Sequence, residues 1–184
     1  MTLSARALGL AHVAFAALLA LASAGPAAAA PSEVSAAGFL VSLRYEVKAA
    51  PGRLWQALGE VDRWWNPSHT WSGSSANLSL SREAPGCFCE RWEAGSVEHG
   101  RVIHAARDSL LRVQGALGPL QALAVDGVLS FAIAEKEGKT ILQVSYRVSG
   151  NDAAGLQQYA AAVDGVIAEQ ARRLVAYAES GKPD

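Results

Sequence analysis

LQQYAAAVDGVIAEQARRLVAY, residues 156–177, carries the strongest structural signal in the chain. Its apolar residues recur at helical spacing over about six turns, which is typical of an amphipathic helix. They are Leu156, Tyr159, Ala160, Val163, Val166, Ile167, Leu174 and Tyr177, with Gln170 at the same spacing. Because Asn151 and Asp152 are good capping residues, we expect a long helix over residues 153–178 that packs its apolar face against another layer.

The segments upstream of this helix alternate apolar and polar residues, as strands with one buried face do. In the first, residues 39–47, every second residue from Phe39 to Val47 is apolar. Further strand patterns cover residues 78–80, 88–92, 97–105, 110–115, 125–134 and 140–148. Short turns between them predict an antiparallel sheet. Pro51 begins a short helix before this run, and residues 66–75 have the composition of a loop.

A strongly curved sheet covered by a single long helix leaves space that the helix does not fill. We therefore expect a cavity between the two layers, open toward the loop residues near Trp64–Trp71. This arrangement buries the apolar face of the sheet and that of the helix against each other.

Composition limits the functions open to the chain. It has 184 residues, which fits one domain, and 51% of them are hydrophobic and 18% charged, with a formal net charge of −1. The near-zero charge argues against a nucleic-acid partner held by its phosphates.

Residues 1–30 are typical of a Sec-type signal peptide, with Arg6 before an apolar stretch and alanine-rich cleavage sites. The alternative is an uncleaved membrane anchor. We expect cleavage, a mature protein that starts between Gly25 and Pro31, a periplasmic or secreted location, and no stable membrane span. Amino-terminal sequencing of the exported protein checks this, and a start at Thr2 would contradict it.

Several short motifs carry a resemblance to a known family. They are Ala50–Leu58 (APGRLWQAL), Arg63-Trp64-Trp65, Gly86–Glu90 (GCFCE), Gly115–Leu120 (GALGPL) and Val163–Val166 (VDGV). Over residues 38–179 the chain resembles the START-like helix-grip (SRPBCC) superfamily. Within it, the chain is most similar to the branch of polyketide cyclases/dehydrases and homologues of the activator of heat-shock-protein-90 ATPase.

The resemblance implies an α+β helix-grip fold, in which a curved antiparallel sheet wraps around the long C-terminal helix. Residues 31–37 would then be a linker, and residues 180–184 a flexible tail. Members of the superfamily bind lipids, transport hydrophobic ligands, cyclise polyketides or assist a chaperone, so the resemblance implies a fold more strongly than a function.

The tryptophans cluster beside the expected cavity mouth, where aromatic rings can hold an apolar ligand. The alternative for each is core packing. The candidate ligand-binding residues are Trp64, Trp65, His69, Trp71, Phe88, Glu90, Trp92, Tyr159, Val163 and Ile167.

Glu90 shares the expected inner strand face with Phe88 and Trp92, where a carboxylate is costly to bury alone. It is therefore a candidate acid/base or ligand-contacting group, or else a partner of an arginine such as Arg101 or Arg112. On the next strand, alternation places His99 with Arg101 on one face and His104 on the other. Either histidine can face the cavity. The candidate catalytic histidines are His99 and His69, which lies in the loop of residues 66–75 (the tryptophan loop, after Trp71).

Cys87 and Cys89 allow three interpretations: two core thiols, a disulfide, or metal ligands with a histidine. A strand places alternate Cα atoms about 6–7 Å apart, at the edge of disulfide range, so a bond needs local bending. The C-x-C spacing lacks the paired C-x-x-C of zinc sites, and we expect no metal.

We find no nucleophile elbow, phosphate loop or dinucleotide-binding glycine pattern, and we expect no cofactor. The leading hypothesis is an exported protein that binds a hydrophobic or amphipathic small molecule, lipid-like or polyketide-like, in the cavity. A second hypothesis is a cyclase or dehydratase that uses Glu90 and a histidine as acid and base. A third is a protein-partner or chaperone-assisting module, which predicts a large exposed apolar patch.

Overall fold

The computed structural model of the protein describes residues 30–184, so the expected signal peptide lies almost wholly outside the described residues. The described chain forms three α-helices: α1 (Pro51–Gly59), α2 (Val61–Trp64) and α3 (Ala160–Ser180). The strands are β1 (Ser32–Ser35), β2 (Gly38–Val47), β3 (Leu78–Leu80), β4 (Gly86–Trp92), β5 (Gly95–Ala106), β6 (Leu110–Gln114), β7 (Asp126–Lys136) and β8 (Lys139–Ser149).

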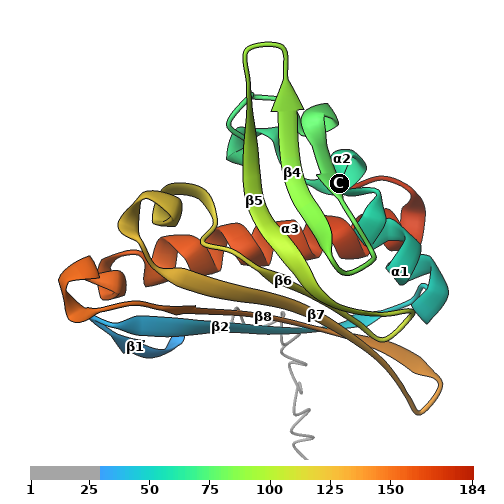
Figure 1. Ribbon diagram of the computed structural model, residues 1–184. Coiled ribbons are helices and arrows are strands. Elements are labelled where there is room, and N and C mark those ends of the chain that lie inside the picture. Colours follow the sequence, from blue (N-terminus) through green and yellow to red (C-terminus); the bar gives the residue numbers. More distant parts are fainter. Residues whose placement is uncertain (1–29) are drawn as a thin grey trace, which may run out of the picture.

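The strands form one antiparallel sheet that curls around α3 (Figure 1). Their order is β1-β2-β8-β7-β6-β5-β4-β3, and every neighbouring pair is antiparallel. The β7–β8 hairpin closes through Glu137 and Gly138, both with positive φ, as a tight two-residue turn requires. The α+β helix-grip architecture is therefore confirmed.

The core lies between the concave face of the sheet and α3. Among the alternate, inward-facing residues of β2 and β8, Phe39, Val41, Leu142 and Val144 are at most 2% exposed. On α3, Leu174 is fully buried on the same side. The predicted period-two and helical stripes thus meet as one apolar layer.

The long helix begins later than the sequence predicts. Residues 153–159 contain 3₁₀ turns at Asp152–Ala154 and Leu156–Gln158, and regular α-helix starts only at Ala160. Gly155, with a left-handed φ of +58°, ends the first of these turns and prevents a helix from continuing across it. The 3₁₀ turn that follows, Leu156–Gln158, leads into α3, as such turns often do at helix N-termini.

The ends of the described chain make contacts with the rest of the domain. Within the expected linker 31–37, Ser32–Ser35 forms β1 and pairs with β2 at the sheet edge. In the expected tail, Asp184 forms an ion pair with Arg173 of α3. No helix among residues 30–184 is both long and apolar enough to cross a membrane.

Candidate ligand cavity

A cavity of about 310 Å³ lies between the sheet and the first turns of α3, on the side of the loop that follows α2. Aromatic and aliphatic side chains form most of its wall, with a few polar groups among them. The lining residues are Trp65, Ser68, His69, Thr70, Trp71, Phe88, His99, Leu117, Gly118, Pro119, Tyr146, Tyr159, Ala162, Val163, Val166 and Ile167. The cavity therefore lies where we expect it from the sequence, between the curved sheet and the long helix and beside the loop near Trp64–Trp71.

One wall of the cavity is the bend at residues 115–119, which Tyr146 holds in place. The Tyr146 hydroxyl donates to the carbonyl of Gly115 at 3.0 Å and accepts from the amide of Leu117 at 2.9 Å. A Cβ on Gly115 would lie 2.2 Å from the carbonyl oxygen of His99, so only glycine fits this approach. Burial raises the pKa of Tyr146, which keeps its hydroxyl protonated as a donor.

Three aromatic rings form one wall of the cavity, from the loop after α2 to the sheet. The centroids of Trp65 and Phe88 lie 5.3 Å apart with the rings nearly edge to face, and those of Phe88 and His99 lie 4.9 Å apart. Such distances are typical of stabilising aromatic contacts. The cavity thus has an aromatic wall that ends in an imidazole.

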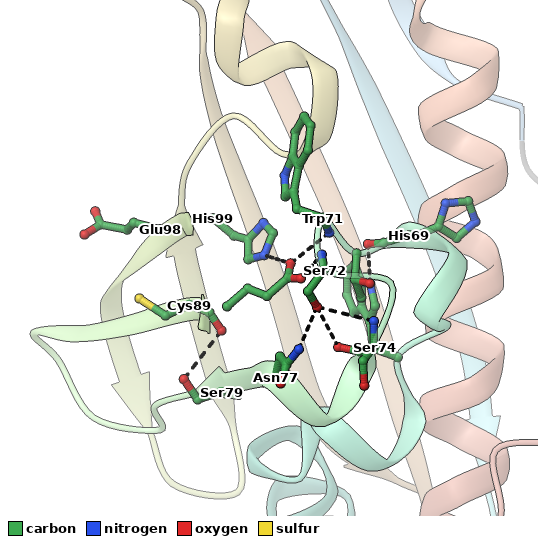
Figure 2. Close-up of polar contacts among 12 residues, drawn as sticks. His69, Trp71, Ser72, Ser74, Asn77, Ser79, Cys89, Glu98 and His99 are labelled. Carbon is green, nitrogen blue, oxygen red and sulfur yellow. Dashed lines mark hydrogen bonds and ion pairs between the residues drawn. The ribbon is translucent and has the colours of Figure 1, made fainter. Parts of the chain in front are cut away.

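Behind this wall, Glu90 of β4 is completely buried and accepts hydrogen bonds from several residues. Figure 2 shows three of the neighbouring residues, Trp71, Ser72 and His99. Its Oε2 accepts from the amide of Trp71 at 3.0 Å and lies 3.1 Å from Nε2 of His99, while Oε1 accepts from the amide of Ser72. Glu90 is absent from the cavity lining. Its carboxylate therefore fixes the loop that follows α2 and the ring of His99, and it does not line the cavity as the sequence led us to expect.

The position of His99 departs from simple strand alternation. Phe88 pairs with Gly100 and Cys89 with Glu98, so a β-bulge leaves His99 as the extra residue of β5. The bulge turns His99 inward, 7% exposed, whereas Arg101 stays exposed. The predicted shared face of His99 and Arg101 is therefore wrong, and so is an arginine partner for Glu90. His104 faces solvent.

The loop at the cavity mouth is also fastened to α3. Glu169 accepts a hydrogen bond from the Asn66 side chain, and its other oxygen lies 3.1 Å from Nε2 of His69. The Gln170 side chain accepts a hydrogen bond from the backbone N–H of Asn66 at 2.8 Å. The Arg173 side chain donates to the backbone carbonyl of Trp64, also at 2.8 Å. Carboxylates on α3 and β4 thus hold the two halves of one loop over the cavity.

Seven of the ten candidate ligand-binding residues line the cavity: Trp65, His69, Trp71, Phe88, Tyr159, Val163 and Ile167. Trp64 does not, because it is fully buried and its indole donates to the Ala57 carbonyl at 2.7 Å. Trp92 does not either, since its ring lies against Gly95 at the β4–β5 hairpin.

Several lining residues were not among the candidates from the sequence. Val166 and Tyr146 carried signals that could have identified them, because one lies on the helix stripe and the other on an inner strand face. The partner of His69 was missed entirely. Nothing in sequence spacing links it to Glu169, a hundred residues away.

Cys87 and Cys89 are joined by a disulfide, with Cα atoms 5.4 Å apart. This separation is shorter than that of alternate residues in a regular strand, in keeping with the bulge beside them. Among residues 30–184, no group of three or more histidine, cysteine and acidic side chains is placed to hold a metal ion.

The Glu90–His99 pair predicts a fold that loses stability in acid. Burial tends to raise the pKa of Glu90, but hydrogen bonds from Ser72, Trp71 and His99 outweigh it and hold the pKa below the usual 4.5. Burial lowers the pKa of His99 below 6.5, against the opposing effect of Glu90. Both groups bind protons less readily when folded, so the unfolded state takes up protons first as pH falls.

We therefore expect the free energy of unfolding to decrease as pH falls from about 6.5, first through His99 and then, below about 4.5, through Glu90. Urea denaturation over this range measures it. In His99→Leu the upper part of the decrease should disappear and the lower part remain. A stability that rises on acidification would contradict the assignment.

Comparison with known proteins shows likeness in structure and none in sequence: no family model and no curated protein matches. The Aha1 dimer of Colwellia psychrerythraea superposes with a TM-score of 0.58 at 17% identity, over 78% of this chain and 98% of that one. DynU16, from the dynemicin biosynthetic locus, gives 0.56 at 19% identity, over 78% of this chain and 48% of its own.

CalU16 of Micromonospora echinospora gives a TM-score of 0.52 at 12% identity, over 80% of this chain and 78% of that one. At such identities the likeness concerns the fold alone, and it agrees with the sheet order and the covering helix described above. The chain therefore has the α+β helix-grip fold.

Proposed function

We propose that the protein is exported and binds a hydrophobic or amphipathic small molecule in the cavity between the sheet and α3. The observation that carries the proposal is the cavity itself, about 310 Å³ with a mostly apolar wall. Cavities for small molecules have volumes of about 300–1,000 Å³ and combine an apolar wall with a few polar groups.

The aromatic wall and the polar groups have separate roles in this proposal. Trp65 and Phe88 supply flat apolar surface, which favours a ligand with rings or a stiff chain. The neighbouring loop is held to both layers, by Glu90 on β4 and by Glu169 on α3. The site is thus largely formed before a ligand arrives, which reduces the entropy lost on binding.

Native mass spectrometry tests the proposal. The mature protein, without its signal peptide, is incubated with an extract of cell lipids and small molecules. We expect the mass of a bound molecule in addition to that of the protein. Val163→Trp, which fills the cavity from α3, should remove that mass. The matched control is Ala161→Trp, which adds the same side chain at an exposed position outside the cavity lining, and it should retain the mass. Equal binding by the two variants would place the ligand elsewhere.

A second candidate, acid–base catalysis, is supported by the two histidines that line the cavity, each beside a glutamate. A carboxylate behind an imidazole is how many enzymes orient a base. Mass analysis of the recovered ligand separates the candidates: a dehydratase changes the ligand mass by one water, and His99→Leu abolishes the change. A ligand recovered unaltered supports binding alone.

The structure gives less support to the protein-partner hypothesis. The large, exposed apolar side chains among residues 30–184 are Val34, Trp71 and Ile103, which belong to three separate segments. A partner surface of the usual kind is a contiguous apolar patch.

A further inference from the structure

The protonation of His99 follows from the bonding of Glu90. Both carboxylate oxygens of Glu90 accept backbone N–H bonds, from Trp71 and Ser72, and backbone amides can only donate. The carboxylate is therefore stabilised in its ionised form, which has no proton to give. Nε2 of His99, 3.1 Å from Oε2, must then be the donor in this pair.

This donor role fixes the second ring nitrogen as an acceptor. A neutral imidazole protonated at Nε2 carries a lone pair at Nδ1. Nδ1 of His99 has no hydrogen-bond partner among residues 30–184, and the ring lines the cavity. Figure 2 shows the ring of His99 beside Trp71, another residue of the cavity lining. The cavity thus contains a basic nitrogen at the end of an aromatic wall.

We propose that His99 selects ligands that carry a hydroxyl donor, such as a phenol or an enol, on an apolar ring system. Nδ1 accepts the hydroxyl hydrogen while the rings of the ligand lie against Trp65 and Phe88. The inference rests on the proposed binding function and names the class of molecule that this site prefers. Glu90 is the positioning residue, because it sets the tautomer of His99 without touching the ligand.

The lining disfavours anionic ligands and ligands that offer only an acceptor. A carboxylate or carbonyl oxygen would direct its lone pairs at that of Nδ1, which is repulsive. The lining contains no lysine or arginine that could hold an anion, and His69 is paired with Glu169. A hydroxyl group is a neutral donor that fits beside apolar walls without needing a counter-charge.

The test compares naphthol with its methyl ether, two probes of similar shape of which only the first can donate. Binding is followed by the quenching of tryptophan fluorescence. We expect naphthol to bind about tenfold more tightly, the effect of one hydrogen bond of about 1.4 kcal/mol. In His99→Leu the two probes should bind equally. His104→Leu is the matched control on the same strand, exposed to solvent, and should keep the preference.

The outcomes separate this inference from the proposed function. If both probes bind wild-type protein equally, the cavity binds apolar molecules and the acceptor role of His99 is overturned. If neither probe binds at any accessible concentration, the proposed function falls and the inference falls with it. A preference that survives in His99→Leu assigns the acceptor to another group and also overturns the inference.

Nitrogen NMR of the imidazole ring tests the positioning role of Glu90 without a ligand. Wild-type protein at neutral pH should show His99 protonated at Nε2 and bare at Nδ1. Glu90→Gln, in which an amide can donate to Nε2, should shift His99 toward the opposite tautomer. A wild-type ring protonated at Nδ1 would contradict the inference directly.

Discussion

Glu90→Gln is expected to lower the free energy of unfolding by about 2–4 kcal/mol, although the side chain keeps its size. Three N–H groups point at the Glu90 carboxylate, from Trp71, Ser72 and His99. An amide offers one oxygen instead of two, so at least one buried donor then faces another donor. Urea denaturation at neutral pH measures the loss.

Hydrogen exchange should show where the stability is lost. The amides of Trp71 and Ser72 are expected to exchange faster in Glu90→Gln, because the bonds that protect them are weakened. Glu98→Gln is the matched control: Glu98 lies on the neighbouring strand, exposed, in an ion pair with Arg101. Such surface pairs contribute at most about 1 kcal/mol. Equal effects of the two substitutions would show that Glu90 is not the loop anchor.

Trp64→Ala is expected to cost about 3–5 kcal/mol of folding stability, as removal of a large buried aromatic side chain does. Trp64 is fully buried, packs 5.6 Å from Trp65 between ring centroids, and donates its indole N–H to the Ala57 carbonyl. The substitution leaves a cavity and removes the indole hydrogen bond to the Ala57 carbonyl, which keeps only its bond from the Glu60 amide. Thermal and urea unfolding measure the loss.

The matched control for Trp64 is Trp71→Ala, at a side chain that is 55% exposed. It should change stability by less than about 1 kcal/mol, because exposed positions contribute little packing. Trp64 also lies outside the cavity lining, so ligand binding should survive Trp64→Ala at temperatures where the variant is folded. If Trp64→Ala changes stability little but abolishes ligand binding, Trp64 is part of the ligand site and this assignment is wrong.

The architecture could be predicted from the sequence because it follows from periodicity. Apolar alternation from Phe39 to Val47 and the helical stripe from Tyr159 to Tyr177 each specify one buried face, and two such faces pack together. Local breaks in that periodicity were missed. Gly155 looked like an ordinary helix residue, yet its left-handed backbone delays α3 to Ala160.

The candidate site could be predicted only in part, because its polar chemistry depends on contacts between distant segments. His69 and His99 were singled out from residue type, and both line the cavity. Their partners could not be identified. Alternation placed His99 with Arg101, whereas a bulge turns it inward, and a bulge has no dependable sequence signal. The carboxylate of Glu90 binds backbone amides, which every residue but proline offers.

A small molecule bound in the cavity between the sheet and α3 is the expectation on which the other functional predictions depend. A crystal structure of the processed protein, purified from its native host without refolding, tests this most directly. The account predicts density for a bound molecule between Trp65, Phe88 and Val163, with a hydroxyl group beside Nδ1 of His99. Well-ordered water alone in the cavity, or a ligand bound only on the outer face of the sheet, would contradict it.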